Sequence, residues 1–228
     1  MTMASRLQQV RARVAAACAA AQRDVQSVTI LAVSKTVEAA RVREAHALGQ
    51  SCFGENYVQE ALEKIEALAD LRGVLQWHLI GPLQSNKTRV VAEHFDWIHS
   101  VDRLKTAQRL SEQRPALLPE LQVCLQVNVS GETSKSGVAP QDVPALALAV
   151  AALPRLRLRG LMSIPEPAAD MQAQRAPHAL LRELLLDLQA RGLAVDTLSM
   201  GMSADLEAAV LEGATLVRIG TAIFGARG

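Results

Sequence analysis

The chain has 228 residues, half of them hydrophobic and only 3% aromatic, with 24 basic and 23 acidic side chains and a formal net charge of +1. This even balance gives no electrostatic basis for binding nucleic acid or an anionic membrane. The longest apolar run, residues 143–154, is too short to span a bilayer. Three widely spaced cysteines, Cys18, Cys52 and Cys124, argue against a zinc or disulfide framework, so we expect no metal and a reducing, cytoplasmic compartment.

The first predicted element is an amphipathic helix within residues 1–26, where charged side chains flank the apolar segment VAAACAAA. From residue 28 to residue 225, short apolar runs alternate with helical patterns. The predicted strands span residues 28–35, 51–56, 75–81, 97–102, 121–130, 156–165, 197–203 and 216–225. The clearest helical patterns between them span residues 37–49, 58–70 and 176–192.

This strict alternation predicts parallel strands joined by right-handed crossovers. Eight such units in about 200 residues predict an α/β fold, a closed (β/α)8 TIM barrel over residues 28–225. We expect residues 1–228 to form one domain, with the extra N-terminal helix in front of the barrel. The alternative, an open doubly wound sheet, usually has fewer strands and a glycine-rich first turn. The first turn here reads SKTVEAA and lacks glycine, which favours the barrel.

Polar and glycine-rich residues gather at the ends of the predicted strands. The first strand ends in Lys35 and the second in Glu55 and Asn56. Later strands end in HLIGPLQSNK, NVSGETSKSG, MSIPEP, MGMS and RIGTAIFG. Because the carboxyl ends of parallel strands meet at one face, where such folds bind ligands, we expect a ligand site there.

Lys35 is the first candidate for chemistry. It ends an apolar strand, and lysine is rarely buried unless another group pairs with it or uses it. A lysine in this position can attack an aldehyde and hold it as a Schiff base. Taken alone, Lys35 is explained more simply as a side chain that extends from the strand end into solvent.

The ends of the last two strands predict a phosphate cradle. Gly201 and Ser203 lie at the end of the seventh predicted strand, and Gly220 and Thr221 lie in the RIGT segment of the eighth. Free backbone N–H groups, two hydroxyls and a helix that starts near Asp205 are typical of phosphate sites. In the alternative, the glycines only form turns and Ser203 only caps the helix. The cradle is favoured because barrels usually bind phosphate after strands seven and eight.

Arg218 lies two residues before Gly220, so strand alternation places both on one face. An arginine that points into a barrel needs a partner. A ligand atom would supply that partner, and so would an acidic side chain such as Glu55.

A strand-end lysine, a phosphate cradle and an inward arginine together suggest pyridoxal 5′-phosphate (PLP). The segments LAVSKT, FGENYVQE, WHLIGPLQSNK, NVSGETSKSG, GLMSIP, LSMGMSADLEAAV and VRIGTAIFGAR occur in this order. They resemble the signatures of the pyridoxal phosphate homeostasis protein family, which is similar to the barrel domain of alanine racemases, a fold type III PLP-binding fold. The likeness covers the chain from about residue 28 onward.

The resemblance implies a role for each candidate residue. Lys35 would form the internal aldimine, and Arg218 would approach the pyridine nitrogen. The other implied cofactor-binding residues are Ser203, Gly220 and Thr221 at the phosphate, Asn56 at the polar ring edge, and Met200 at the ring, with Met162 as the alternative to Met200.

Other side chains have two open interpretations. His78 either faces the cofactor or packs within its strand, and Lys135 either attracts phosphate near the mouth or is a solvated loop lysine. His46, His94, His99 and His178 show no metal-ligand spacing and are expected to be surface or packing residues.

A racemase needs an acid/base on each face of the substrate Cα; the racemases supply the second from a tyrosine of a further domain. This sequence stops soon after its eighth strand, so we expect no such domain, and its only tyrosine is Tyr57. Arg218 is always protonated, which would leave the pyridine nitrogen unprotonated and the ring a weak electron sink.

The resemblance therefore implies a PLP-binding protein of vitamin B6 homeostasis without its own turnover, one that would pass PLP to apo PLP-dependent enzymes. A monomer is expected, because racemases dimerise partly through the additional domain. One alternative is a PLP-dependent amino-acid racemase or another weak PLP enzyme. The other is a barrel that binds a phosphate ligand without an aldimine.

Overall fold

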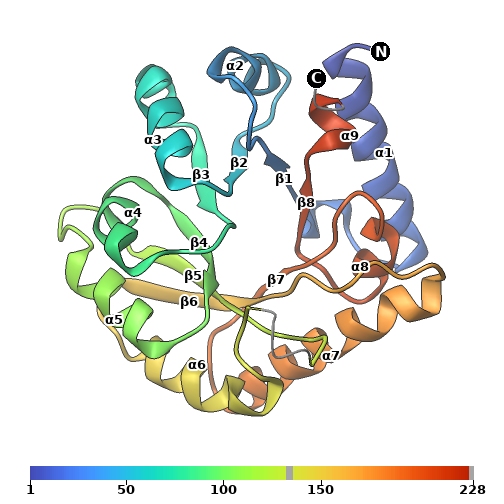
Figure 1. The fold of residues 1–228 in the computed structure, drawn as a ribbon. Helices are drawn as coiled ribbons and strands as arrows, with labels where there is room; N and C mark the ends of the chain where they lie inside the picture. The colour runs from blue at the N-terminus through green and yellow to red at the C-terminus, as the bar shows by residue number, and fades with distance from the viewer. Residues whose placement is uncertain (132–135, 226–228) are drawn as a thin grey trace.

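In a computed structural model that describes residues 1–131 and 136–225, eight parallel strands form a closed barrel surrounded by helices (Figure 1). The strands are β1 (Thr29–Val33), β2 (Cys52–Glu55), β3 (Gln76–Leu79), β4 (Trp97–Val101), β5 (Leu121–Gln126), β6 (Leu156–Met162), β7 (Thr197–Ser199) and β8 (Leu216–Ile219). The ring closes where β1 pairs with β8, with Thr29 opposite Leu216 and Ala32 opposite Ile219. The predicted barrel is confirmed, and the open sheet is excluded.

Helices fill the connections as the alternation predicts. The α-helices are α1 (Met3–Ala20), α2 (Ala39–Ala47), α3 (Val58–Ala67), α4 (Thr88–His94), α5 (Leu104–Gln113), α6 (Val143–Ala151), α7 (Met171–Ala190), α8 (Leu206–Leu211) and α9 (Thr221–Phe224), and the 3-10 turns are η1 (Val25–Ser27), η2 (Ala69–Leu71), η3 (Ser85–Lys87) and η4 (Pro140–Asp142). The extra helix α1 contacts α8 and α9 and covers the seam between β8 and β1 (Figure 1). Within the described residues, no helix is both long and apolar enough to cross a membrane.

The observed strands end earlier than the sequence predicts. β5 stops at Gln126 and β7 at Ser199, and residues 221–224 of the last predicted strand form α9 instead. The reason is the backbone at the mouth of the barrel. There the chain leaves the sheet in turns, such as the one at Gly201, whose φ of +89° is readily adopted only by glycine.

The core is built mostly from aliphatic side chains, as the low aromatic content requires. Ile98, Leu125 and Leu161 are fully buried on the strands in the cluster that includes the helix residues, while Leu31 is buried in a smaller cluster with Ile80 and Leu216. α1 contributes residues at helical spacing, including Leu7, Val10 and Val14, which are also buried. Each buried side chain of this size stabilises the fold by roughly 1.5–3 kcal/mol.

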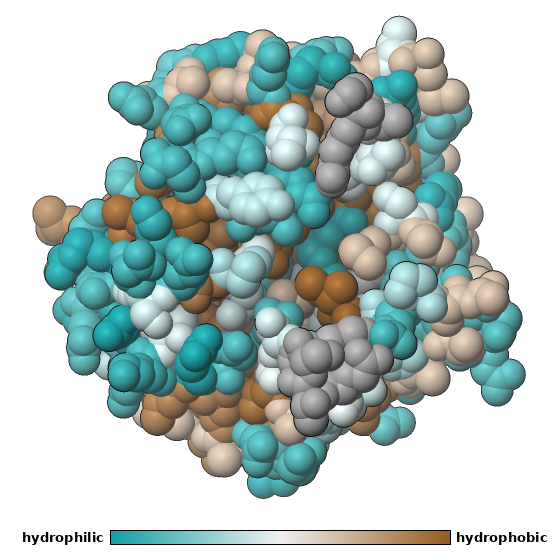
Figure 2. Space-filling view, viewed as in Figure 1, coloured by the Kyte–Doolittle hydropathy of each residue, from teal (hydrophilic) through white to brown (hydrophobic). Residues whose placement is uncertain are grey.

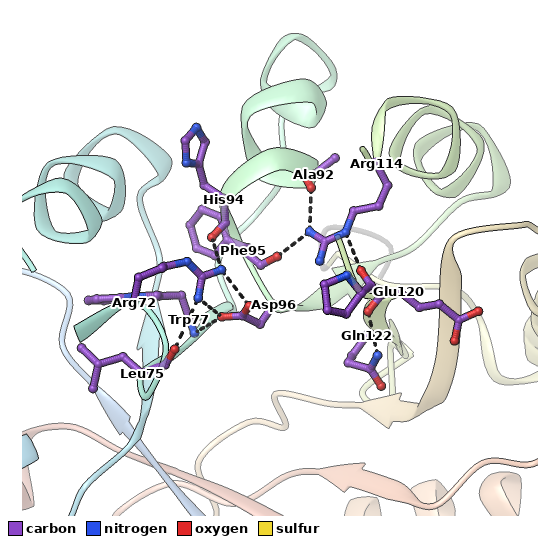
Figure 3. A network of polar contacts seen from close by, with 11 residues as sticks. Arg72, Leu75, Trp77, Ala92, His94, Phe95, Asp96, Arg114, Glu120 and Gln122 are labelled. Carbon is purple, nitrogen blue, oxygen red and sulfur yellow. Dashed lines mark hydrogen bonds and ion pairs between the residues drawn. The ribbon is translucent and has the colours of Figure 1, made fainter. Parts of the chain in front are cut away.

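Hydrogen bonds hold the N-terminal ends of β3 and β4, opposite the predicted site (Figure 3). The Asp96 carboxylate accepts from the Trp77 backbone N–H at 2.8 Å and pairs with Arg72. Buried Arg114 donates to the carbonyls of Ala92 and Phe95 at 2.7 and 2.9 Å, in and after the last turn of α4. These bonds satisfy carbonyls that a helix end leaves unpaired, so this face contributes stability rather than chemistry.

Candidate functional site

A cavity of about 990 Å³ opens at the carboxyl ends of the strands. Figure 2 shows this face hollowed near its centre, with hydrophilic and hydrophobic side chains around the hollow. Six of the seven predicted site residues line the cavity: Lys35, Asn56, Ser203, Arg218, Gly220 and Thr221. The structure therefore brings together in one space residues that follow β1, β2, β7 and β8 or lie within β8.

The methionine prediction is the exception. Met200 is fully buried and is not among the lining residues, and neither is its alternative, Met162. Met202 lines the cavity in place of Met200. The reason is that regular alternation ends with β7 at Ser199, and the turn at Gly201 changes which side chains face the mouth.

Lys35 lies two residues beyond β1, in a tight turn and partly buried. The turn is closed by the Val37 backbone N–H, which donates to the Ser34 carbonyl at 3.0 Å. Thr36 has a φ of +61°, a left-handed conformation that is uncommon for a β-branched residue. Such backbone strain persists only where surrounding contacts enforce it.

Charged side chains from β2 and α3 make those contacts. Lys64 Nζ donates to Glu55 Oε1 at 2.8 Å, to Glu60 Oε1 at 2.6 Å and to the Ser34 carbonyl at 2.6 Å. Burial raises the pKa of Glu55, and the neighbouring Lys64 ammonium opposes that rise. Because Glu55 pairs with Lys64, it is not the partner of Arg218.

Arg218 is 4% exposed and lines the cavity from β8. Its Nη1 donates to the Ser199 carbonyl at 2.6 Å and to Ser199 Oγ at 2.8 Å, and its Nη2 donates to the Ser163 carbonyl at 2.7 Å. Burial lowers the pKa of Arg218 to about 10, so the guanidinium stays charged at neutral pH. A guanidinium has five N–H donors, and the described residues occupy three of them, which leaves donors for a ligand.

A chain of hydrogen bonds runs from Arg218 into the barrel. His99 Nδ1 lies 2.8 Å from Ser199 Oγ, and His99 Nε2 lies 3.0 Å from His78 Nδ1. His78 stacks on Trp97 with ring centroids 5.2 Å apart. Burial lowers the pKa of His78 to about 3 and that of His99 well below its usual value, so both rings are neutral. His78 is therefore a packing residue and does not line the cavity.

The remaining histidines differ in how deeply their side chains are buried. His46 and His94 lie partly or fully at the surface, as expected. His178 is buried and its Nε2 lies 3.0 Å from Asp205 Oδ2. Lys135 lies outside the described residues.

The loop after β7 is held from two sides. Asp205 Oδ1 accepts from the Met202 N–H at 2.7 Å, while His178 fixes the other carboxylate oxygen of Asp205. Arg13 of α1 donates to the Ser203 carbonyl at 3.0 Å and forms a two-bond ion pair with Glu207, at 2.8 Å for each bond. The sequence does not predict this support from α1, because no local pattern links residue 13 to residue 203.

The cradle residues suit a phosphate group. α9 begins at Thr221, beside Gly220, and its first backbone N–H groups have no carbonyl partner within the helix. A phosphate can accept hydrogen bonds from these N–H groups and from the Ser203 and Thr221 hydroxyls. Asn56 lines the same cavity, and its buried Oδ1 has no hydrogen-bond partner among the described residues. Together with Lys35 and Arg218, this donor and acceptor set fits a phosphorylated aromatic aldehyde such as PLP.

Comparisons with known proteins agree with this geometry. The alanine racemase N-terminal domain family matches residues 6–228. The chain is 68% identical to the pyridoxal phosphate homeostasis protein of Pseudomonas aeruginosa over 226 residues, which cover 99% of this chain and 96% of that one. It is 53% identical to the protein of the same name from Escherichia coli K12, with 99% and 97% covered.

Solved structures place the fold in the same group. PipY from Synechococcus elongatus, solved with PLP bound, is 42% identical with a TM-score of 0.85, covering 98% of this chain and all of that one. The alanine racemase of Corynebacterium glutamicum is 17% identical with a TM-score of 0.70, covering 97% of this chain and 62% of that one, which shows a shared fold. The chain belongs to the pyridoxal phosphate homeostasis protein family, whose barrel is of the alanine racemase N-terminal type.

Proposed function

We propose that the protein binds PLP in the cavity at the mouth of the barrel, bonds it covalently through Lys35 and serves vitamin B6 homeostasis by holding and delivering the cofactor. One observation carries the proposal. Lys35, the charged donors of Arg218 and the hydroxyls of Ser203 and Thr221 all line one cavity. The PLP bound in PipY, a relative of nearly equal length, supports the same ligand here.

Each side chain has a distinct role in this proposal. Ser203, Thr221 and nearby backbone N–H groups bind the phosphate, and Arg218 donates to the pyridine nitrogen. Asn56 contacts the polar edge of the ring. The cofactor, when bound, supplies an aldehyde that reacts with amines. The amine of Lys35 competes with other amines for that aldehyde. Lys35 therefore retains the cofactor until another amine displaces it.

We further propose that the protein has no turnover of its own. Although burial lowers the pKa of Arg218 to about 10, Arg218 keeps its proton at neutral pH and so does not protonate the pyridine nitrogen. An unprotonated ring stabilises a carbanion poorly. Tyr57, the residue type that serves as second base in the racemases, is the N-cap of α3, 58% exposed and not among the lining residues.

The attachment site is tested by borohydride reduction followed by peptide mapping. Reduction should fix the label on Lys35, and Lys35→Ala should lose both the label and the yellow colour of the bound cofactor. Lys105→Ala, which changes an exposed lysine of α5, is the matched control and should keep both. A label on another lysine would place the covalent bond elsewhere. PLP bound without any reducible label would support the barrel that binds only a phosphate ligand.

Turnover is tested by Cα-proton exchange in deuterated water across a panel of D- and L-amino acids. We expect negligible exchange, together with transfer of PLP to an apo PLP-dependent enzyme. Sustained exchange at ordinary enzymatic rates, on the order of 1–10³ per second, that Lys35→Ala abolishes would establish an enzyme instead.

We also propose that the protein works as a cytoplasmic monomer. Its three cysteines are all free, which suits a reducing compartment. Sedimentation velocity of the cofactor-loaded protein measures the oligomeric state directly, and a dimer would contradict this part of the proposal.

A further inference from the structure

The backbone on both sides of Lys35 is bonded to the same pair of charged side chains of α3. On one side, the Ser34 carbonyl accepts from Lys64 Nζ at 2.6 Å. On the other side, the Thr36 backbone N–H donates to Glu60 Oε1 at 2.5 Å. Lys64 and Glu60 are themselves paired at 2.6 Å, one helical turn apart. Lys35 is thus the middle residue of a segment that α3 holds at both ends.

These bonds hold the backbone of Thr36 in an unfavourable conformation. Thr36 is β-branched and left-handed, so without its bond to Glu60 it would relax toward the ordinary negative-φ region. Relaxation at residue 36 would reorient the peptide that joins it to Lys35. Side-chain bonds to the Ser34 carbonyl and the Ser34 hydroxyl, which donates to Glu55 Oε1 at 2.6 Å, fix the other end of the turn.

The structure assigns Glu60 and Lys64 as positioning residues for Lys35: they hold the left-handed turn that keeps the Lys35 amine at the cavity before any cofactor binds. This inference rests on the proposed function of Lys35. The covalent step replaces the aldehyde C=O by C=N and releases one water, so no oxidant or reductant is needed. The amine must already lie within reach of the aldehyde carbon, because only a positioned nucleophile gains the advantage of proximity.

Glu60 is the better residue to change. Lys64 is buried, and removing it would leave Glu55 as an uncompensated buried charge, which endangers folding. Glu60 is more exposed and lies in the first turn of α3. Glu60→Ala removes the acceptor of the Thr36 N–H. Glu60→Gln keeps a carbonyl oxygen as that acceptor and removes the charge. Glu63→Ala, an exposed glutamate of the same helix, is the control.

Measurements with two ligands distinguish a loss of Lys35 positioning from a general loosening of the cavity. PLP reports covalent attachment through its absorbance, whereas pyridoxine 5′-phosphate has the same ring and phosphate but no aldehyde. Glu60→Ala should lower the equilibrium constant for covalent attachment of PLP by about tenfold, the effect of one lost charge-assisted hydrogen bond. The affinity for pyridoxine 5′-phosphate should stay within about twofold, as for a surface change. Glu60→Gln should recover most of the attachment, and Glu63→Ala should resemble the parent.

Amide hydrogen exchange at Thr36, measured by NMR on the cofactor-free protein, tests the turn without any ligand. Exchange should be slow in the parent, in Glu60→Gln and in Glu63→Ala, and faster in Glu60→Ala. Equal losses of affinity for both ligands, or unchanged attachment and exchange in Glu60→Ala, would overturn the assignment. A label away from Lys35 in the parent peptide map would instead refute the proposed function, while the Thr36 exchange rate would still report on the turn.

Discussion

The buried His78–His99 pair predicts how the stability of the barrel depends on pH. In the folded protein, burial lowers the pKa of His78 to about 3, whereas the ring in the unfolded chain titrates near its ordinary value of about 6.5. Between these values the unfolded state binds the extra proton, so stability is complete above about pH 6.5 and falls as the pH falls toward 3. At pH 5, about 1.5 units below the unfolded pKa, His78 alone costs ~2 kcal/mol.

The assay is urea unfolding at pH 7 and pH 5, compared between the parent and His78→Asn. The asparagine side chain keeps a polar atom near the position of Nδ1, which lies 3.0 Å from His99 Nε2, but it cannot take up a proton. The variant should therefore lose about 2 kcal/mol less than the parent between the two pH values. His99, whose pKa is also lowered, adds to the loss in both proteins, so the difference isolates His78.

His94→Asn is the matched control, because His94 is exposed on α4. Its loss of stability between pH 7 and pH 5 should equal that of the parent. If His78→Asn and the parent lost the same free energy of unfolding within the error of the extrapolation, the neutral buried pair would not be the origin of the pH dependence.

Two further predictions concern the site. Changing Ser203 and Thr221 together to Ala should weaken binding of pyridoxine 5′-phosphate without unfolding the barrel, by roughly 1.5–3 kcal/mol for each hydroxyl in calorimetric titration; unchanged affinity would place the phosphate elsewhere. A Cβ added at Gly81 would lie 2.1 Å from the Asn56 carbonyl oxygen. Gly81→Ala should therefore lower stability by about 1–3 kcal/mol and weaken cofactor binding, whereas Gly73→Ala, with open space around the new atom, should do neither.

The sequence predicts the barrel and most of the site because both depend on short patterns. Each strand is an apolar run, and each polar interruption marks the point where the chain reaches the mouth. That regularity is enough to place Lys35, Ser203 and Arg218 at one face. It overextends the strands because apolar residues continue the pattern beyond the sheet: Ile164 lies in the loop after β6 and Phe224 lies in helix α9, and both line the cavity.

The supporting contacts could not be predicted in the same way. Glu60 and Lys64 have the spacing of an ordinary exposed ion pair on a helix, and only the packing of α3 against β2 makes Lys64 a buried residue. His99 and Ser199 face inward by alternation, but they come from β4 and β7, and no local rule pairs residues that are 100 positions apart. The methionine at the mouth depends on one glycine turn, at Gly201, that strand alternation does not include.

The pairing of β1 with β8 has a consequence for synthesis on the ribosome. Lys35 follows β1, which is translated before β8, while Arg218 lies in β8 and Thr221 directly after it. Until β8 emerges, β1 has an unpaired edge and the lysine has no phosphate cradle beside it, although α2 and α3 are already complete. If PLP binds as proposed, loading must follow the arrival of β8, so free cofactor cannot template the early stages of folding.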